Sequence, residues 1–250
     1  METHAHELHK APGHGWRHYF FEFFMLFLAV FCGFLAENFR EQLGEHRLEK
    51  EYMRSLVEDL QTDTANLNGE IPFGLGIRDW GEKLILLLNQ DHLTKDSIEK
   101  LYLLSMKTTR VVKIDFEDRT SSELKNGGNM HLIRNKQVAD SIRNYWSIIK
   151  VADNVSQRLE MTANKAADIR ERLFYGKYIK FADVHKPLES DFSVLPGAKL
   201  IDDDPKLLAE YANRRQHVSI VMNVYISLLK ESNNAAQSLM KLIKKEYDLD

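Results

Sequence analysis

Residues 19–36 read YFFEFFMLFLAVFCGFLA, an eighteen-residue stretch with a single ionisable side chain, Glu22. A helix that crosses a bilayer needs about 20 predominantly apolar residues. Trp16 and Phe39 extend the stretch to that length and supply aromatic side chains of the kind that lie at membrane interfaces. We therefore predict a transmembrane helix over residues 17–39.

Two other kinds of segment share this composition. A signal peptide also has an apolar stretch near the N-terminus, but no small-residue cleavage site follows here, because Glu37 comes directly after Ala36. A core helix of a soluble protein has a polar side, whereas Phe residues surround this helix on every side. We favour an uncleaved anchor, preceded by a short, flexible, His-rich tail at residues 1–16.

The charges beside the anchor do not decide its orientation. Lys10 and Arg17 lie on one side, and Arg40, Arg47 and Lys50 lie on the other among several glutamates. Cytoplasmic flanks carry an excess of Lys and Arg, and here the two flanks are nearly balanced.

Three residues of the anchor are candidates for contacts within the membrane: Glu22, Ala29 and Gly33. An intramembrane carboxylate suggests a proton relay or a helix contact, but Glu22 lies near the interface, with His18 one turn earlier, so we favour an interfacial position. Ala29 and Gly33 are four residues apart, a spacing of small residues that lets two helices approach closely. They form either an association surface or a chance pair.

Residues 40–250 have the pattern of a helical soluble domain. Apolar residues recur at steps of three and four over three long segments, at about 40–68, 136–178 and 205–247. Gly69, Pro72, Gly74 and Gly76 predict a break after the first of these. Shorter helices are expected at 78–91, at 95–108 with Thr94 as its cap, and at 118–126 before Gly127 and Gly128; residues 110–116 are either a short strand or an extended link.

The last helix has the clearest pattern. Asp204 can cap it, and Pro205 suits its first turn. An apolar seam, which we name the α-seam, follows alternating steps of three and four and is formed mainly by Leu208, Tyr211, Val218, Met222, Tyr225, Leu229, Leu239 and Ile243. A second column beside it, Val221, Leu228, Ala235 and Leu242, suits burial against two neighbouring helices.

The predicted fold class is therefore all-α. An N-terminal transmembrane helix continues into an elongated antiparallel helical bundle, in which each helix of some forty residues would be roughly 60 Å long.

Composition excludes several classes of function. The formal net charge is −3, and Lys, Arg, Asp and Glu are spread along the chain, so we expect no nucleic-acid partner. The one cysteine, Cys32, lies in the apolar segment, which excludes a disulfide framework and a cysteine-based metal site.

No catalytic, cofactor-binding or metal-binding residues are predicted. His6, Glu7 and His9 are one residue short of the spacing of the HExxH zinc motif, and no Gly-x-Ser-x-Gly elbow or phosphate-binding glycine loop occurs. The neighbouring carboxylates Glu58 and Asp59 are interpreted as a solvated helix face. We predict that the chain is not an enzyme and needs no cofactor.

Two stretches resemble a family of uncharacterised single-pass membrane proteins of Bacteroidota, catalogued as a domain of unknown function. The first runs from Glu22 to Leu60 and includes the motif ENFRE at 37–41; the second is SELKNGGNMHLIRN at 122–135, followed by Tyr145 and Trp146. In ENFRE, Asn38 and Glu41 match the family's motif and Phe39 replaces its Trp. The resemblance implies an inner-membrane location with a cytoplasmic N-terminus and a periplasmic C-terminal domain, and it implies no activity.

These observations favour a membrane-anchored interaction or scaffold protein. Its expected partners are membrane lipid and either a second copy of itself or another membrane or envelope protein. The alternative is an extracytoplasmic ligand-sensing protein or an accessory subunit of a membrane complex. Only about sixteen residues precede the anchor, which disfavours a sensor with an output domain there.

Overall fold

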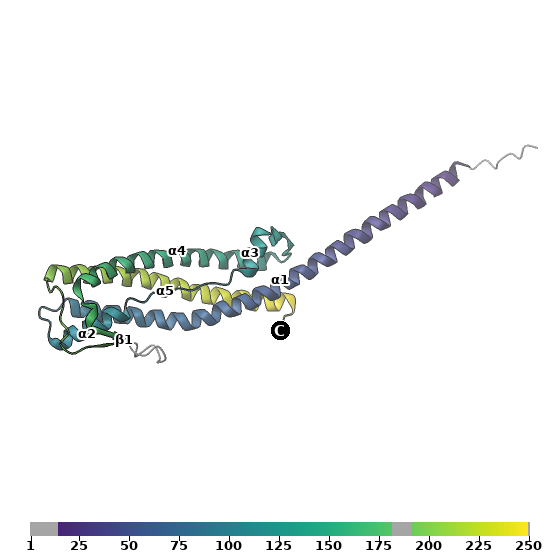
Figure 1. Cartoon of the computed structure of the whole chain (residues 1–250). Coiled ribbons are helices and arrows are strands. Elements are labelled where there is room, and N and C mark those ends of the chain that lie inside the picture. Colours follow the sequence, from purple (N-terminus) through teal and green to yellow (C-terminus); the bar gives the residue numbers. More distant parts are fainter. Residues whose placement is uncertain (1–14, 182–191, 250) are drawn as a thin grey trace, which may run out of the picture. The chain divides into compact units, whose positions relative to one another are not determined.

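The computed structural model describes residues 15–181 and 192–249. Most of them are helical, which confirms the all-α class (Figure 1). The α-helices are α1 (Trp16–Leu88), α2 (Lys95–Lys107), α3 (Arg119–Asn126), α4 (Lys136–Leu173) and α5 (Pro205–Tyr247). Two 3-10 turns, η1 (Asn129–Leu132) and η2 (Gly176–Tyr178), and a hairpin of β1 (Ile179–Phe181) and β2 (Phe192–Val194) complete the order. Nearly all of the predicted His-rich tail lies outside the described residues.

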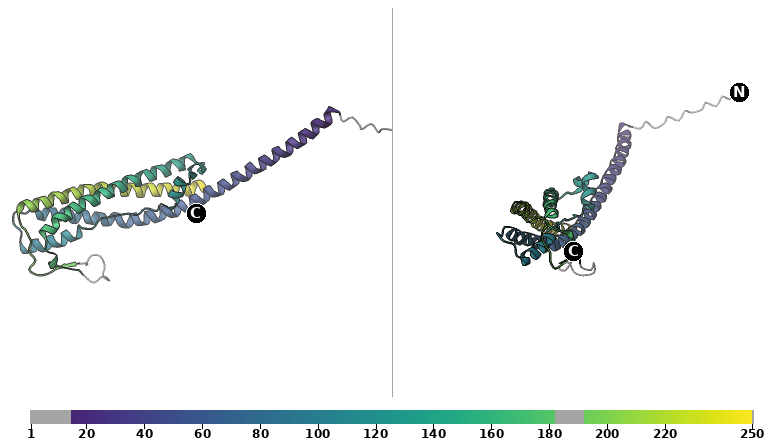
Figure 2. Two further views of the ribbon diagram at one scale, coloured as in Figure 1. Left: turned by 45° about the horizontal axis from the view of Figure 1, so that its top comes forward. Right: turned by 60° about the vertical axis from the view of Figure 1, so that its left-hand side comes forward.

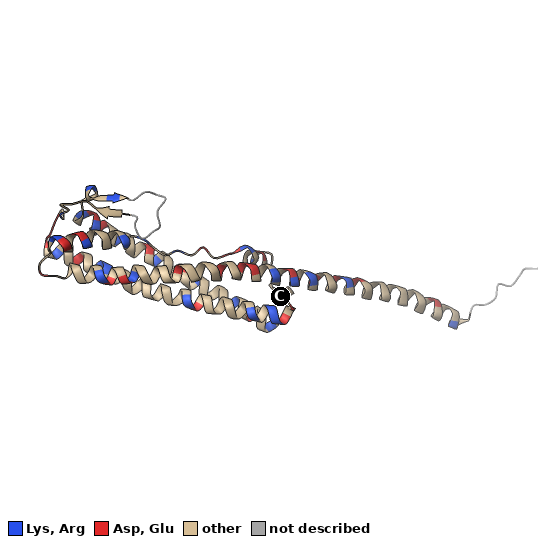
Figure 3. Ribbon diagram, turned by 90° about the horizontal axis from the view of Figure 1, so that it is seen from below, with Lys and Arg blue, Asp and Glu red and all other residues tan. Residues whose placement is uncertain are grey.

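The chain divides into two compact parts, residues up to Glu51 and residues from Tyr52 onward, and α1 contributes to both. In the first part every residue from 16 to 44 is exposed. The Phe27 ring stacks on those of Phe23 and Phe31, one helical turn away on either side, at centroid distances of 6.5 and 5.9 Å. Figure 3 shows that the start of α1 is almost free of charged residues.

The predicted break of the first helix at residues 69–76 is wrong, because α1 continues to Leu88 with Pro72 inside it. Gly74 and Gly81 lie on its buried stripe, where a Cβ at Gly74 would come within 3.1 Å of Val112 and one at Gly81 within 3.2 Å of Ser219. The other members of this stripe are Leu67, Ile71, Ile77, Leu84 and Leu88.

Energetics explain this continuity. A proline inside a helix costs about 3 kcal/mol and a glycine about 1 kcal/mol. Each fully buried Leu or Ile contributes roughly 1.5–3 kcal/mol, so the five buried side chains of the stripe outweigh the helix-breaking residues. Gly74 and Gly81 are therefore sites of close packing, whereas a Cβ at Gly69 or Gly76 would meet no atom within 4 Å.

The shorter helix predicted at 78–91 is wrong, because these residues form the end of α1, whereas those predicted at 95–108 and 118–126 begin and end close to their predicted bounds. The Thr94 hydroxyl accepts a hydrogen bond from the backbone N–H of Ser97 at 3.1 Å and caps α2. After α3, Gly128 adopts a left-handed conformation with φ of 67°, which favours glycine. Residues 110–116 form the extended link and no strand; Val112 and Ile114 alternate inward along it.

The start of α5 agrees with its predicted bounds, and the Asp204 carboxylate accepts from the N–H of Lys206 at 3.0 Å. The end of α4 is corrected, since the helix was expected to reach residue 178 and ends at Leu173. Phe174 instead forms an antiparallel bridge with Leu200, and the N–H of Tyr175 donates to the Tyr102 hydroxyl at 3.0 Å. These contacts with distant residues replace the helical hydrogen bonds that would have followed.

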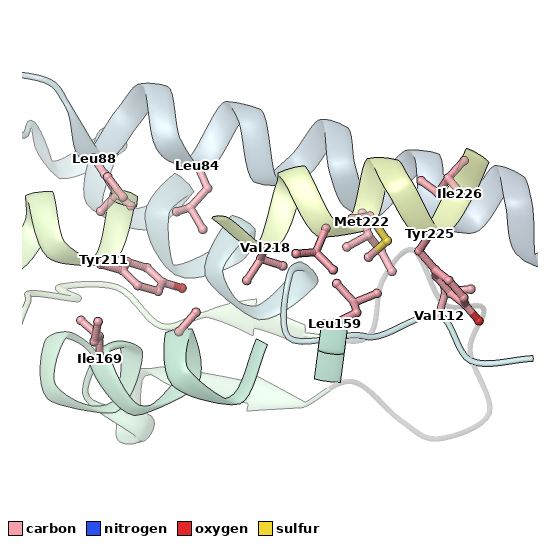
Figure 4. Packing of buried hydrophobic residues seen from close by; sticks show 14 of the residues in the cluster. Leu84, Leu88, Val112, Leu159, Ile169, Tyr211, Val218, Met222, Tyr225 and Ile226 are labelled. Carbon is pink, nitrogen blue, oxygen red and sulfur yellow. The ribbon is translucent and has the colours of Figure 1, made fainter. Parts of the chain in front are cut away.

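Within the second part, α1, α4 and α5 form a bundle with two buried apolar clusters. One cluster joins the stretch of α1 around Met53 to the start of α4 and the end of α5, and the other joins the end of α1 to the end of α4 and the start of α5. Thus α5 is antiparallel to both α1 and α4, which run in the same direction. The extended link carries the chain back along the bundle, and Val112 packs in the core (Figure 4).

Candidate interaction face

An open groove of about 1150 Å³ runs between α4 and α5. The two helices lie side by side along most of their length (Figure 2). Apolar groups in the groove come from Ile148 on α4 and from Ala235, Leu239 and Leu242 on α5. We name this surface the α4–α5 groove. It is formed by regular helices.

The apolar column of the groove continues beyond its lining. On α5, Leu242, Ala235, Leu228 and Val224 lie on one stripe, with Ser238 and Glu231 between them, at steps of three and four. Val224 is 50% exposed, and Leu228, Ala235 and Leu242 are half-buried. A half-buried apolar column on a long helix is typical of a face that can accept another helix.

Charged residues flank the groove unevenly. Lys136, Lys241 and Lys245, together with one carboxylate, Asp140, line the end where α4 begins and α5 finishes, and Glu231 lines the other end. An apolar floor with a charged rim is the usual anatomy of a protein–protein interface. The basic end would favour acidic residues on the helix that occupies it.

The predicted α-seam lies inside the bundle, beside the column that lines the groove. All eight of its residues, from Leu208 to Ile243, are buried, and the most exposed of them is Leu208 at 7%. Two polar residues interrupt the apolar steps of the seam: Arg215, after Tyr211, and Ser232, after Leu229. Both are also buried. The α-seam is therefore core, and the neighbouring column is the surface available to a partner.

The three candidates in the predicted anchor are all exposed in α1. Glu22, Ala29 and Gly33 lie in the part of the chain that ends at Glu51, and a Cβ built on Gly33 would meet no atom within 4 Å. This face of α1 is open to lipid or to another helix.

The interpretation of Asp59 as part of a solvated face is wrong. Its side chain is 5% exposed, and its carboxylate accepts from the Arg119 guanidinium at 2.8 Å and from the Thr120 N–H at 3.1 Å. Glu58, its neighbour, remains exposed. Asp59 attaches the start of α3 to α1.

A second buried carboxylate, Asp63, was not singled out from the sequence. One oxygen accepts from the Glu117 N–H at 2.8 Å, and the other accepts from the Tyr145 hydroxyl at 2.7 Å. Burial raises the pKa of Asp63 from 3.8 to about 6 and also raises the pKa of Tyr145. Asp63 thereby joins α1, the extended link and α4.

One sequence signal could have identified both carboxylates. Asp59 and Asp63 are four residues apart and fall on the stripe that contains Leu56, Leu60 and Leu67. A carboxylate at such a position is buried, and a buried carboxylate needs donors. The extended link, α3 and α4 supply these donors.

The resemblance of residues 22–60 and 122–146 to the Bacteroidota family remains a prediction. The first stretch lies within α1, and the second extends from α3 through η1 into α4. Comparison of the whole chain with protein-family profiles, with curated proteins and with solved structures finds no match.

Proposed function

We propose that this chain is a membrane-anchored helical interaction or scaffold protein whose α4–α5 groove binds a helix of another membrane or envelope protein. The observation that carries the proposal is the half-exposed apolar column of α5, flanked by charges along an open groove. A fourth helix laid on this column would bury Leu228, Ala235 and Leu242 completely.

The membrane anchor is supported by composition and exposure. Among the described residues, α1 is the one helix that is long and apolar enough to cross a bilayer, with a mean hydropathy of 2.1 over its best eighteen-residue window and none of that window buried. An exposed apolar surface of this extent is stable in lipid and unfavourable in water.

We further propose an inner-membrane location with the N-terminus in the cytoplasm and residues 40–250 in the periplasm, as the family resemblance implies. Alkaline phosphatase fused after Asp250 should then be active, because that enzyme matures only outside the cytoplasm. Deletion of residues 17–39 from the fusion should abolish both activity and membrane retention. An inactive but stable full-length fusion would reverse the topology.

The charges of the groove favour a partner other than a second copy. If two copies paired their grooves in parallel, the basic groove ends, with Lys136, Lys241 and Lys245, would face each other and repel. A helix with acidic residues at this end would be attracted. Self-association is assigned instead to the anchor, through Ala29 and Gly33.

Site-specific photo-crosslinking in native membranes tests both assignments. A photoreactive residue replacing Ser238 in the groove should capture a different protein, and Leu242→Lys should reduce that product about tenfold or more, because a buried unpaired charge costs more than 1.4 kcal/mol. Leu86→Lys is the matched control, since Leu86 is 70% exposed on α1. It should leave the product unchanged.

In the same membranes, Gly33→Ile should weaken crosslinks between copies of the chain and leave the Ser238 product intact. If the parent and Leu242→Lys gave equal amounts of the Ser238 crosslinked product, the groove would not be the binding site. A Ser238 product that consists of two copies of this chain would replace the foreign helix with self-association.

The alternative is an extracytoplasmic ligand-sensing or accessory subunit. A smaller polar pocket between α2, α4 and α5 favours it, because a sensor needs a concave site between helices.

A further inference from the structure

Two arginines meet at a small pocket where α2 ends against α4 and α5. The pocket has a volume of about 40 Å³. Its polar lining comes from Ser105, Thr108, Thr109, Asn164, Arg170, Tyr211 and Arg215. The volume exceeds the roughly 10–15 Å³ that one water molecule requires, so the pocket can hold a small ligand.

Arg215 reaches the pocket from α5. It is 4% exposed, and its Nη1 donates to the carbonyl of Thr108 at 3.1 Å, at the end of α2. Its Nε is buried and has no hydrogen-bond partner in the described part of the chain. Gly81 on α1 lies beside the guanidinium, since a Cβ there would be in ordinary contact with Nη2 at 3.7 Å.

Arg170 reaches the same pocket from α4. Its Nη2 contacts the sulfur of Met106, and its Nε is likewise buried without a partner among the described residues. Both guanidinium charges act on the hydroxyl of Tyr211, and each opposes the rise in the pKa of Tyr211 that burial causes. Both arginines therefore line the same pocket as Tyr211.

The contact with Thr108 explains only part of this arrangement. An arginine that donates to the last carbonyls of a helix is a common cap, and it satisfies one of five N–H donors. It does not explain why a second arginine shares the pocket. The two guanidinium groups form no ion pair with a carboxylate of the described chain. Buried charge of one sign without a counter-charge is costly.

We propose that this pocket binds a small oxyanion of about the size of inorganic phosphate. Such an anion would neutralise both guanidinium groups, and their planar donor sets match the oxygens of phosphate or carboxylate. The hydroxyls of Ser105, Thr108 and Tyr211 are the further polar groups that line the pocket. The proposal is independent of the α4–α5 groove and would hold if that groove bound nothing.

The test is thermal unfolding of the full-length chain in detergent, with sodium phosphate, sulfate, formate or chloride at equal ionic strength. At about one hundred times the Kd, phosphate should raise Tm by roughly 5–10 °C, because a ligand that binds only the folded state stabilises it. Phosphate and sulfate also stabilise proteins without binding, so a variant must separate the two effects.

Arg170→Gln is that variant, because Arg170 is half-buried and its loss is better tolerated than that of Arg215. It should weaken the Kd for phosphate at least tenfold by calorimetric titration and remove the specific rise in Tm. Arg172→Gln, an exposed position on the same helix, is the control and should respond like the parent. Equal rises in the parent and in Arg170→Gln, or a rise with chloride as large as with every oxyanion, would overturn the proposal.

Discussion

Leu229→Asp is expected to abolish the cooperative unfolding transition of the helical bundle. Leu229 is 0% exposed and packs in the cluster that joins α1, α4 and α5. A carboxylate there would lie among apolar side chains without a donor, at a cost of several kcal/mol. A domain of this size has a typical stability of roughly 5–15 kcal/mol, so most of it would be lost. Urea unfolding of the full-length chain in detergent, followed by circular dichroism, measures the effect.

Two further variants separate burial from the introduced charge. Met222→Asp, at 2% exposure on the same seam, should behave like Leu229→Asp. Asn223→Asp adds the same carboxylate at the neighbouring exposed position and should change stability by less than about 0.5 kcal/mol. If Leu229→Asp and Met222→Asp both unfolded like the parent, α5 would face solvent or an empty partner site.

Asp63 should make the stability of the bundle fall as pH rises from about 4 to about 6. Burial raises the pKa of Asp63 from 3.8 to about 6, so the folded state holds a proton over this window that the unfolded state has released. The contribution of Asp63 to the free energy of unfolding is therefore greatest below pH 4 and decreases as the pH rises to about 6. Each unit of pKa difference corresponds to about 1.36 kcal/mol, so a difference of roughly two units gives a decrease of about 3 kcal/mol.

Asp63→Asn is the test, because an amide has nearly the same shape and does not titrate. Its oxygen can still accept from the N–H of Glu117, and its amide nitrogen can donate to the Tyr145 hydroxyl. Denaturant unfolding at several pH values should show that Asp63→Asn gains stability relative to the parent between pH 4 and 7. Parallel pH profiles for the two chains would rule out a raised pKa for Asp63.

Asp63→Ala distinguishes the hydrogen bonds from the charge. It would leave the N–H of Glu117 and the hydroxyl of Tyr145 without their acceptor, which should make it about 2–4 kcal/mol less stable than Asp63→Asn at every pH. The extended link would lose one of its attachments to α1. Neither variant titrates at this position, so their pH profiles should be parallel to each other, and both should lack the fall in stability that Asp63 gives the parent.

The sequence by itself determined the features that depend on local order. The steps of three and four from Leu208 to Ile243, with a capping carboxylate at Asp204 and a proline after it, define α5 because helix periodicity and capping involve neighbouring residues. The candidate membrane span at 17–39 is equally local, since it follows from length and composition. The all-α class follows from the same patterns.

Tertiary structure alone decided the continuity of α1 through Pro72 and the end of α4 at Leu173. It also decided which donors Asp59 and Asp63 meet, and that Arg170 and Arg215 line one pocket. Each depends on residues that are distant in the chain. Val112 and Ser219 pack against Gly74 and Gly81 of α1, and Leu200 pairs with Phe174. Glu117 and Tyr145 donate to Asp63, and the carbonyl of Thr108 at the end of α2 accepts from Arg215. Local propensities amount to about 1–3 kcal/mol per residue, and packing or hydrogen bonding between distant segments can exceed them.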